Sequence, residues 1–150
     1  MTAVIPVRAA GIDDLSALLM LYRELHPTEP PLPEALAAAT YRQMLAQPGL
    51  TTFLALDGET PVATATLVVT PNLTRDAKPY ALIENVVSLT SHRGRGFGRA
   101  AVCAAIAAAW RAGCYKAMLL TGRSDEAVHR FYRDCGFRQD KTGFQIRRPA

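Results

Sequence analysis

Apolar and polar positions recur along this chain with two periods, one typical of helices and one typical of strands. Leucines at helical spacing behind Asp13, a good N-cap, predict a first helix that ends near Leu25, before a proline-rich segment over residues 26–33. Runs rich in β-branched and apolar residues predict strands. The predicted helices cover residues 13–25, 34–46, 99–110 and 125–134, and the predicted strands cover residues 4–8, 51–56, 62–70, 80–88, 115–121 and 143–147.

These elements follow one another in the order β-α-α-β-β-β-α-β-α-β, with no internal repeat, low-complexity run or linker between them. Such an order predicts an α/β sandwich built on a mixed sheet. A chain of 150 residues with 49% hydrophobic and 20% charged residues can bury one good core. The sequence therefore predicts a single domain over residues 1–150.

Composition excludes several classes of protein. The N-terminal sequence does not resemble a secretory signal and no apolar stretch is long enough to span a bilayer, so we expect a soluble cytoplasmic protein without a membrane partner. The formal charge of +4 favours anionic ligands without requiring nucleic acid, and no nucleic-acid partner is expected. No metal site is expected, because the cysteines and histidines lack metal-ligand spacing. These residues are Cys103, Cys114, Cys135, His26, His92 and His129.

The most informative segment is Arg-Gly-Arg-Gly-Phe-Gly-Arg over residues 93–99, between an apolar strand and an alanine-rich helix. A helix start leaves backbone N–H groups unpaired and carries a partial positive charge, so it can hold a phosphate without side-chain donors. Glycines let the backbone bend tightly and approach a ligand, and the three arginines add positive charge. The segment therefore predicts a site for a polyanionic cofactor.

Residue spacing argues against three other interpretations of this segment. Gly94, Gly96 and Gly98 are evenly spaced, whereas a dinucleotide fingerprint needs G-x-G-x-x-G, and no Gly-Lys-Ser/Thr follows as in a Walker loop. Residues 95–98 match the opening of an RNA-recognition signature, but the aromatic residues that should follow are absent. A tight glycine turn that only packs a helix onto a sheet is what an isolated cluster of this kind would indicate.

The cluster is not isolated, because two blocks of the chain resemble motifs of the GNAT superfamily of N-acetyltransferases. Motif A of that family reads Arg or Gln, two residues, Gly, one residue, then Gly or Ala, and Arg93, Gly96 and Gly98 occupy those positions. Residues 127–137 resemble motif B, in which a helix ends in an aromatic-Tyr pair followed by Gly-Phe. The resemblance covers nearly the whole chain and implies the GNAT fold, an α/β fold with a mixed central sheet of six to seven strands flanked by about four helices.

The same resemblance implies acetyl-CoA as cosubstrate and no metal. The pantetheine arm is expected to lie along the strand before the glycine loop, in the way that an added strand would. One amide near Val87 is expected to polarise the thioester carbonyl. The backbone amides of the loop are expected to hold the pyrophosphate. Ser124 stands where motif B often has an asparagine, so its contact with the cofactor is weaker, water-mediated or absent. The expected cofactor-binding residues are Val86, Val87, Ser88, Arg93, Gly94, Arg95, Gly96, Phe97, Gly98, Arg99 and Ser124.

Two residues are candidates for the chemistry. By resemblance, Tyr132 is the acid that protonates the departing CoA thiolate. A phenol suits this role because it stays protonated at neutral pH. The alternative is that Tyr132 is a packing residue whose hydroxyl bonds to the backbone. Glu84 interrupts an apolar strand where glucosamine-phosphate acetyltransferases have a glutamate that faces the acceptor amine. It is the candidate base, acting through water, with pairing to an arginine or simple orientation of the amine as alternatives.

The expected reaction is direct attack, within a ternary complex, by the primary amine of a small molecule. Glu29 lies near Glu24 and Glu34 in the sequence, which favours a cationic acceptor such as an amino sugar, a polyamine or an amino-acid-like amine, although these acids fit an ordinary solvated face equally well. A homodimer is left open. The alternative from a different class is a sensor of GNAT fold that binds acetyl-CoA without turnover.

Overall fold

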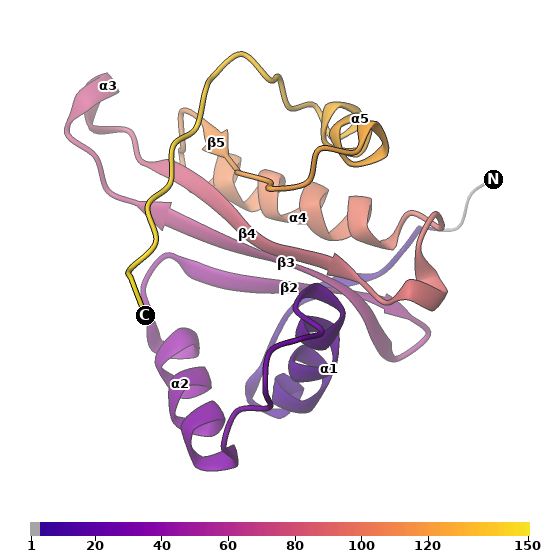
Figure 1. Ribbon diagram of the computed structural model, residues 1–150. Helices are drawn as coiled ribbons and strands as arrows, with labels where there is room; N and C mark the ends of the chain where they lie inside the picture. Colours follow the sequence, from indigo (N-terminus) through magenta and orange to yellow (C-terminus); the bar gives the residue numbers. More distant parts are fainter. Residues whose placement is uncertain (1–3) are drawn as a thin grey trace. The chain divides into compact units, whose positions relative to one another are not determined.

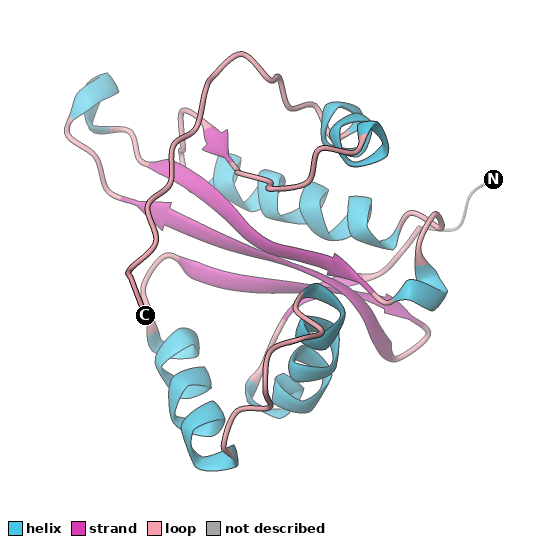
Figure 2. Cartoon of the chain, viewed as in Figure 1, coloured by secondary structure: helices cyan, strands magenta, loops and turns pink. Residues whose placement is uncertain are grey.

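The computed structural model describes residues 4–150, which divide after Leu119 into two compact units. The first unit contains the sheet, and its elements are shown in Figures 1 and 2. Its strands are β1 (Val7–Ala9), β2 (Leu50–Asp57), β3 (Thr60–Thr70), β4 (Tyr80–Ser88) and β5 (Ala117–Met118). Its helices are α1 (Leu15–Leu25), α2 (Glu34–Ala46), α3 (Thr74–Ala77) and α4 (Phe97–Arg111), with 3-10 turns η1 (Ile12–Asp14) and η2 (Thr90–His92). The second unit contains α5 (Glu126–Asp134).

The five strands form one mixed sheet in the order β1-β2-β3-β4-β5. The first four are antiparallel to their neighbours, and β5 runs parallel to β4. Gly58, with φ of +62°, allows the tight turn between β2 and β3 that the Asp-Gly pair predicts. Figure 1 shows α4 over one face of the sheet and α1 and α2 over the other.

Each face of the sheet buries its own set of apolar residues. On the α1 side the buried cluster consists of Leu18, Leu21, Tyr41, Leu54 and Val87. On the other side α4 buries a stripe made largely of alanines, and these small side chains let the helix lie close to the strands. The β4 strand therefore contacts a helix on both of its faces, α1 on one and α4 on the other.

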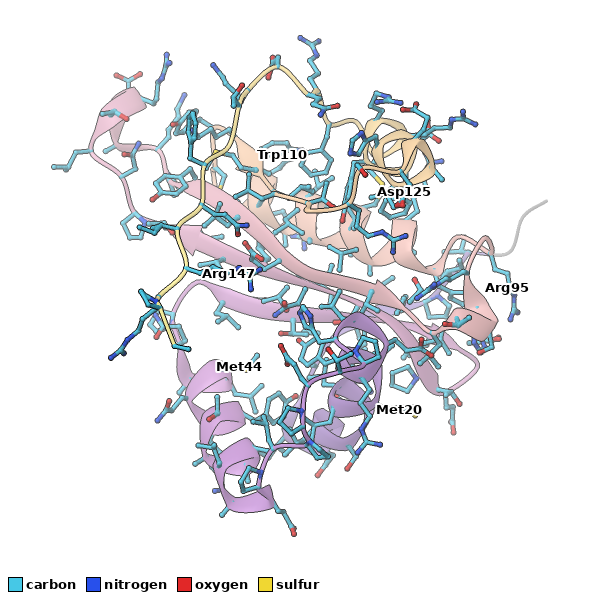
Figure 3. All side chains as sticks on the ribbon, viewed as in Figure 1. Met20, Met44, Arg95, Trp110, Asp125 and Arg147 are labelled. Carbon is cyan, nitrogen blue, oxygen red and sulfur yellow. The ribbon has the colours of Figure 1, made fainter. Side chains whose placement is uncertain are left out.

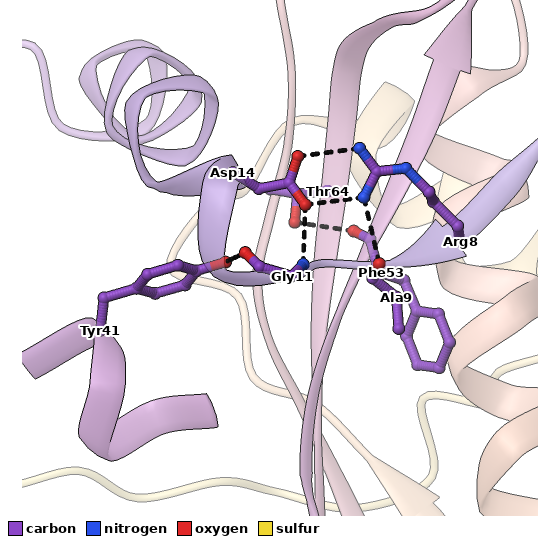
Figure 4. A network of polar contacts seen from close by, with 7 residues as sticks. All are labelled: Arg8, Ala9, Gly11, Asp14, Tyr41, Phe53 and Thr64. Atoms are coloured by element: carbon purple, nitrogen blue, oxygen red, sulfur yellow. Dashed lines mark hydrogen bonds and ion pairs between the residues drawn. The ribbon is translucent and has the colours of Figure 1, made fainter. Parts of the chain in front are cut away.

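A polar network fastens the start of α1 to α2 (Figure 4). Arg8 on β1 donates two hydrogen bonds to the Asp14 carboxylate, at 2.6 and 2.8 Å, and the Gly11 amide donates a third at 2.7 Å. The hydrogen bond from Arg8 is the largest cause that lowers the pKa of Asp14. The Tyr41 hydroxyl of α2 donates a hydrogen bond to the Gly11 carbonyl at 2.6 Å, so its proton is already bonded within the fold.

Apart from the short α3, the order of elements through β4 and α4 is as the sequence predicts, but the strand count is lower. The described residues form five strands rather than six to seven. The predicted strand over residues 143–147 is wrong, since no described strand pairs with this segment and Phe144 and Ile146 are 90% and 98% exposed. Alternation of apolar and polar residues shows only that a segment can pair, and a free strand edge must also be available.

Element boundaries also differ in places. The predicted strand over residues 115–121 shortens to Ala117–Met118, the first strand is Val7–Ala9 rather than residues 4–8, and α4 begins at Phe97, two residues early. The short α3 between β3 and β4 has no counterpart in the prediction. Its residues Arg75, Asp76 and Ala77 all have positive φ, which is a left-handed turn without a helical sequence pattern.

No described helix has the length and apolar character needed to cross a bilayer.

Candidate active site

A β-bulge interrupts β4 at the place where the sequence predicts catalytic chemistry. Thr66 on β3 pairs with Glu84, and Thr64 pairs with Val87, so that two β4 residues stand opposite Ala65 alone. One of these two, Asn85, has a φ of +52°, in the left-handed region that asparagine tolerates better than most residues. A bulge bends its strand and increases the local twist, so β4 changes direction just after Glu84.

Beyond the bulge, β4 has a free edge. Its pairing with β5 consists of Ala81 with Ala117 and Leu82 with Met118, and no described strand pairs with this edge further along β4. Backbone groups along an unpaired edge can bind an extended ligand that carries amides, as a further strand would. The predicted cofactor segment Val86–Ser88 lies on this free part of β4. The Val87 side chain is buried in the core, so only its backbone is available to a ligand.

The glycine loop leads from the end of β4 into α4. Gly94 and Gly96 have φ values of +72° and +90°, and Gly96 is the N-cap of the 15-residue helix. The first helical amides have no intrahelical acceptor and carry the positive end of the helix dipole. Phe97 is buried, so its ring anchors the helix start and only its amide can face a ligand. This arrangement can hold a pyrophosphate on backbone donors.

Side chains from two other elements hold this loop in place. Asp57, at the end of β2, lies 3.1 Å from the Arg95 guanidinium and 3.3 Å from His92 Nε2. The Arg95 guanidinium also stacks over the Phe97 ring, 5.2 Å from its centroid. Figure 3 shows Arg95 at the turn that precedes α4. Arg95 is therefore partly neutralised before any anion binds, and no local sequence pattern indicates Asp57 as its partner.

Glu24 secures the other side of the loop. Its carboxylate accepts hydrogen bonds from the Thr90 hydroxyl at 2.6 Å and the Thr90 amide at 3.4 Å, and lies 3.9 Å from the Arg93 guanidinium. The hydrogen bond from the Thr90 hydroxyl is the main cause that lowers the pKa of Glu24. The end of α1 is thus tied to η2, immediately before the glycine loop. Sequence reasoning placed Glu24 with the acceptor-binding acids and missed this contact.

Glu84 is exposed on the face of the sheet that α1 covers. No hydrogen bond or ion pair joins its carboxylate to another residue of the described chain, so the predicted alternative of a pair with an arginine is not present. Glu84 precedes the free edge of β4 by two residues. Arg99 is likewise exposed, on the first turn of α4. The structure thus places the candidate base and the candidate cofactor segments on one strand and the loop that follows it.

Tyr132 and Ser124 lie in the second unit. Tyr132 is on α5, where its ring makes edge contacts with Phe131 at 5.0 Å and with Phe137 at 6.1 Å between centroids. Ser124 is exposed just before the helix, and Gly136, with φ of +97°, follows its end. The roles of Tyr132 as acid and Ser124 as cofactor ligand stay predictions. No group of three or more potential metal ligands occurs in the part of the chain that the structure describes.

A bulged strand with an edge that no described strand pairs with, followed by a glycine-rich helix start, has the chemistry to bind an extended anionic ligand. A model of the Acetyltransferase (GNAT) family matches residues 15–137. A curated relative, the glucosamine 6-phosphate N-acetyltransferase of Trypanosoma brucei brucei, is 32% identical over 142 residues, which are 93% of each chain. The chain therefore belongs to the GNAT family and is an N-acetyltransferase.

Solved structures agree with this family. A protein of Agrobacterium tumefaciens str. C58, classed provisionally as an acetyltransferase, is 60% identical, with a TM-score of 0.93 over 96% of this chain and 100% of its own. The aminoglycoside N-acetyltransferase AAC(6')-Iy, solved in complex with CoA, has a TM-score of 0.80 over 98% of this chain and 96% of its own. At 18% identity, this second similarity shows the fold alone.

Proposed function

We propose that this N-acetyltransferase moves the acetyl group of acetyl-CoA onto the primary amine of an amino sugar, by direct attack within a ternary complex. The observation that carries the proposal is the position of the unpaired, exposed Glu84 carboxylate beside the free edge of β4. An amino sugar is favoured over a polyamine or an amino acid because the curated relative at 32% identity is a glucosamine 6-phosphate N-acetyltransferase.

The residues present fit acetyl-CoA as the donor. Extended amides of the pantetheine arm would pair with the backbone of Val86–Ser88, whose outer edge has no strand partner. The pyrophosphate would lie on the amides of the loop from Gly94 to Arg99, where positive φ values and the absence of side chains at the glycines bring the backbone close to a ligand. Arg93 and Arg99 add positive charge, while Arg95 is shared with Asp57.

The proton inventory assigns a role to each candidate residue. An acceptor amine is protonated at neutral pH, so a proton must leave before its lone pair can attack the thioester carbonyl, and Glu84 accepts this proton through a bridging water. A new C–N bond forms and leaves a positive charge on the nitrogen, which releases its second proton to solvent as the C–S bond breaks. The departing thiolate takes a proton from the Tyr132 hydroxyl, and solvent then restores that proton. A backbone amide near Val87 stabilises the negative charge that develops on the carbonyl oxygen.

A thiol-release assay with an amine panel tests this function. Glucosamine 6-phosphate, glucosamine, spermidine and a free amino acid are each mixed with acetyl-CoA, and release of CoA thiol is followed over time. We expect turnover with at least one amino sugar at a higher kcat/KM than with the other amines. Thermal stabilisation by acetyl-CoA without thiol release from any amine would instead support a non-catalytic sensor and contradict the proposal.

A further inference from the structure

Two cations near the start of β4 contact aromatic rings and no carboxylate. The Lys116 ammonium lies 5.4 Å from the centre of the Tyr115 ring and 5.8 Å from the centre of the Tyr80 ring. The Arg75 guanidinium lies 5.7 Å from the centre of the same Tyr115 ring. Within residues 4–150, neither cation forms an ion pair with a carboxylate. A cation that lies over a ring keeps its N–H donors available for an anion.

The backbone that carries Arg75 is strained. Arg75, Asp76 and Ala77 of α3 have φ values of +57°, +58° and +58°, in the left-handed region that residues other than glycine rarely adopt. Residues held in this region cost stability and are concentrated at ligand-binding and catalytic sites. This turn lies at the end of the sheet where β4 begins (Figure 1), and it holds Arg75 over the Tyr115 ring. A role in ligand binding would account for the strain.

The Tyr80 ring and the Lys116 ammonium lie on the same face of the sheet as Glu84. Side chains alternate along a strand, so Tyr80, Leu82 and Glu84 share one face, and the bulge comes only after Glu84. The residues between them are buried on the other face, whereas Tyr80 and Leu82 are half-buried and Glu84 is exposed. In the register of β5, Met118 pairs with Leu82, so Lys116 stands beside Tyr80.

The groups along β4 follow an order that fits a phosphorylated amine as acceptor. The glycine loop proposed for the pyrophosphate follows the C-terminal end of β4, Glu84 lies near the middle of the strand, and Tyr80 begins it. The backbone from Tyr80 to Glu84 spans about 13 Å, and the long side chains of Glu84 and Lys116 shorten this gap from both ends. An acceptor with its amine at Glu84 can therefore extend along β4, away from the cofactor, and bring an anionic group to Lys116.

We propose that Arg75 and Lys116 bind a phosphate group of the acceptor, so that the enzyme selects a phosphorylated amino sugar over the unphosphorylated sugar. The inference rests on the proposed function and specifies its acceptor. A phosphate monoester carries about 1.5 to 2 negative charges at pH 7 and has three acceptor oxygens, which suit a guanidinium fork and an ammonium. The Tyr80 and Tyr115 rings hold the two cations without a negative charge that would compete with the phosphate.

Kinetics with a matched pair of acceptors tests the inference. Glucosamine 6-phosphate and glucosamine carry the same amine and differ in the phosphate. We expect the wild type to have the higher kcat/KM with the phosphorylated acceptor. Lys116→Met and Arg75→Gln should each reduce this preference about tenfold, as for the loss of one charge-assisted hydrogen bond. Lys78→Met is the matched control, because it removes a positive charge next to α3 from a residue that lies over neither ring in the described chain.

Calorimetric binding separates this inference from the proposed function. With CoA present, glucosamine 6-phosphate should bind the wild type about tenfold more tightly than it binds Lys116→Met. Such a difference without turnover of any amine would overturn the proposed function and leave the anion site standing. The inference is overturned by a Lys116→Met enzyme that keeps the wild-type preference, by an equal loss of preference in Lys78→Met, or by a wild type that does not prefer the phosphorylated sugar.

Discussion

The candidate site has two parts, the bulge of β4 and the glycine loop that follows β4, and they differ in how their polar groups are paired. At the glycine loop, carboxylates from α1 and β2 already engage the charged side chains: Glu24 binds Thr90 and faces Arg93, and Asp57 pairs with Arg95. At the bulge, the Glu84 carboxylate is exposed and forms no hydrogen bond or ion pair with another residue of the described chain. The charged side chains of the loop are thus paired before a ligand binds, whereas the Glu84 carboxylate at the bulge remains able to accept hydrogen bonds.

This difference matches what each end is proposed to do. A cofactor with a fixed structure is bound best by a loop whose conformation is settled in advance, because less ordering is required on binding. A catalytic group raises the rate through interactions that are stronger in the transition state than in the ground state. A side chain that has no partner in the free enzyme can make such interactions with the reacting groups. The account therefore predicts that changes at the loop alter acetyl-CoA binding, and that changes at the bulge alter turnover.

The largest effect is expected from Gly96→Val at the loop. Gly96 has φ of +90°, which a β-branched residue rarely adopts, so the loop must change its conformation, and a Cβ added there would lie 3.4 Å from Ile5 Cδ1. Acetyl-CoA should no longer raise the Tm of this variant, whereas it should raise the Tm of the wild type. Gly113→Val is the control, because Gly113 has a similar φ of +80° at the other end of α4. A folded Gly96→Val protein that is stabilised as the wild type would show that the loop is not the cofactor site.

The next largest effect is expected from Tyr132→Phe. The substitution keeps the ring contacts with Phe131 and Phe137 and removes the hydroxyl donor. Acetyl-CoA affinity should persist, while the single-turnover rate should fall about 10²-fold, at the lower end of what a positioned acid contributes. Single turnovers are needed because product release can hide the chemical step. Wild-type single-turnover rates over several acceptors and pH values would leave Tyr132 a packing residue.

Glu84→Gln tests the bulge itself. Activity should fall most at pH 7 and below, where the acceptor is mainly ammonium, and should recover in part at higher pH, where the free amine is present without a base. Acetyl-CoA affinity, measured in the same buffers, should stay at the wild-type value. A loss of activity that is uniform across pH would indicate that Glu84 orients the amine and does not take its proton.

The smallest effect is expected from Glu24→Gln, which weakens the tie between α1 and η2. Acetyl-CoA affinity should fall only about threefold, since the backbone donors of the loop remain. The pKa of Glu24 is lowered in the folded state, so its contribution to stability is full above its unfolded-state pKa and disappears as the pH falls through its folded-state pKa. Urea unfolding should therefore show a larger difference from the wild type at pH 7 than at pH 3. Asp14→Asn, a control away from the loop, should lower stability without affecting cofactor affinity.

Much of the first unit is predictable from local sequence. Periodicity and breakers predict α1, α2 and the hairpin of β2 and β3, because each depends on residues close together in the chain. The glycine loop is predictable for the same reason. Two features of the site are not predictable in this way: the bulge at Asn85 and the pairing of Asp57 with Arg95. They depend on the register between strands and on contacts across the fold.

The most direct test of the account is a crystal structure of the protein with acetyl-CoA bound. We expect the pantetheine amides to hydrogen-bond with the β4 backbone between Val86 and Ser88, and the pyrophosphate to lie on the amides of residues 94–99. The thioester carbon should then lie beside the bulge, on the side of Glu84. A cofactor that occupies another surface, or a β4 edge without contacts to the pantetheine arm, would contradict the central claim that the free edge of β4 and the loop after it form the acetyl-CoA site.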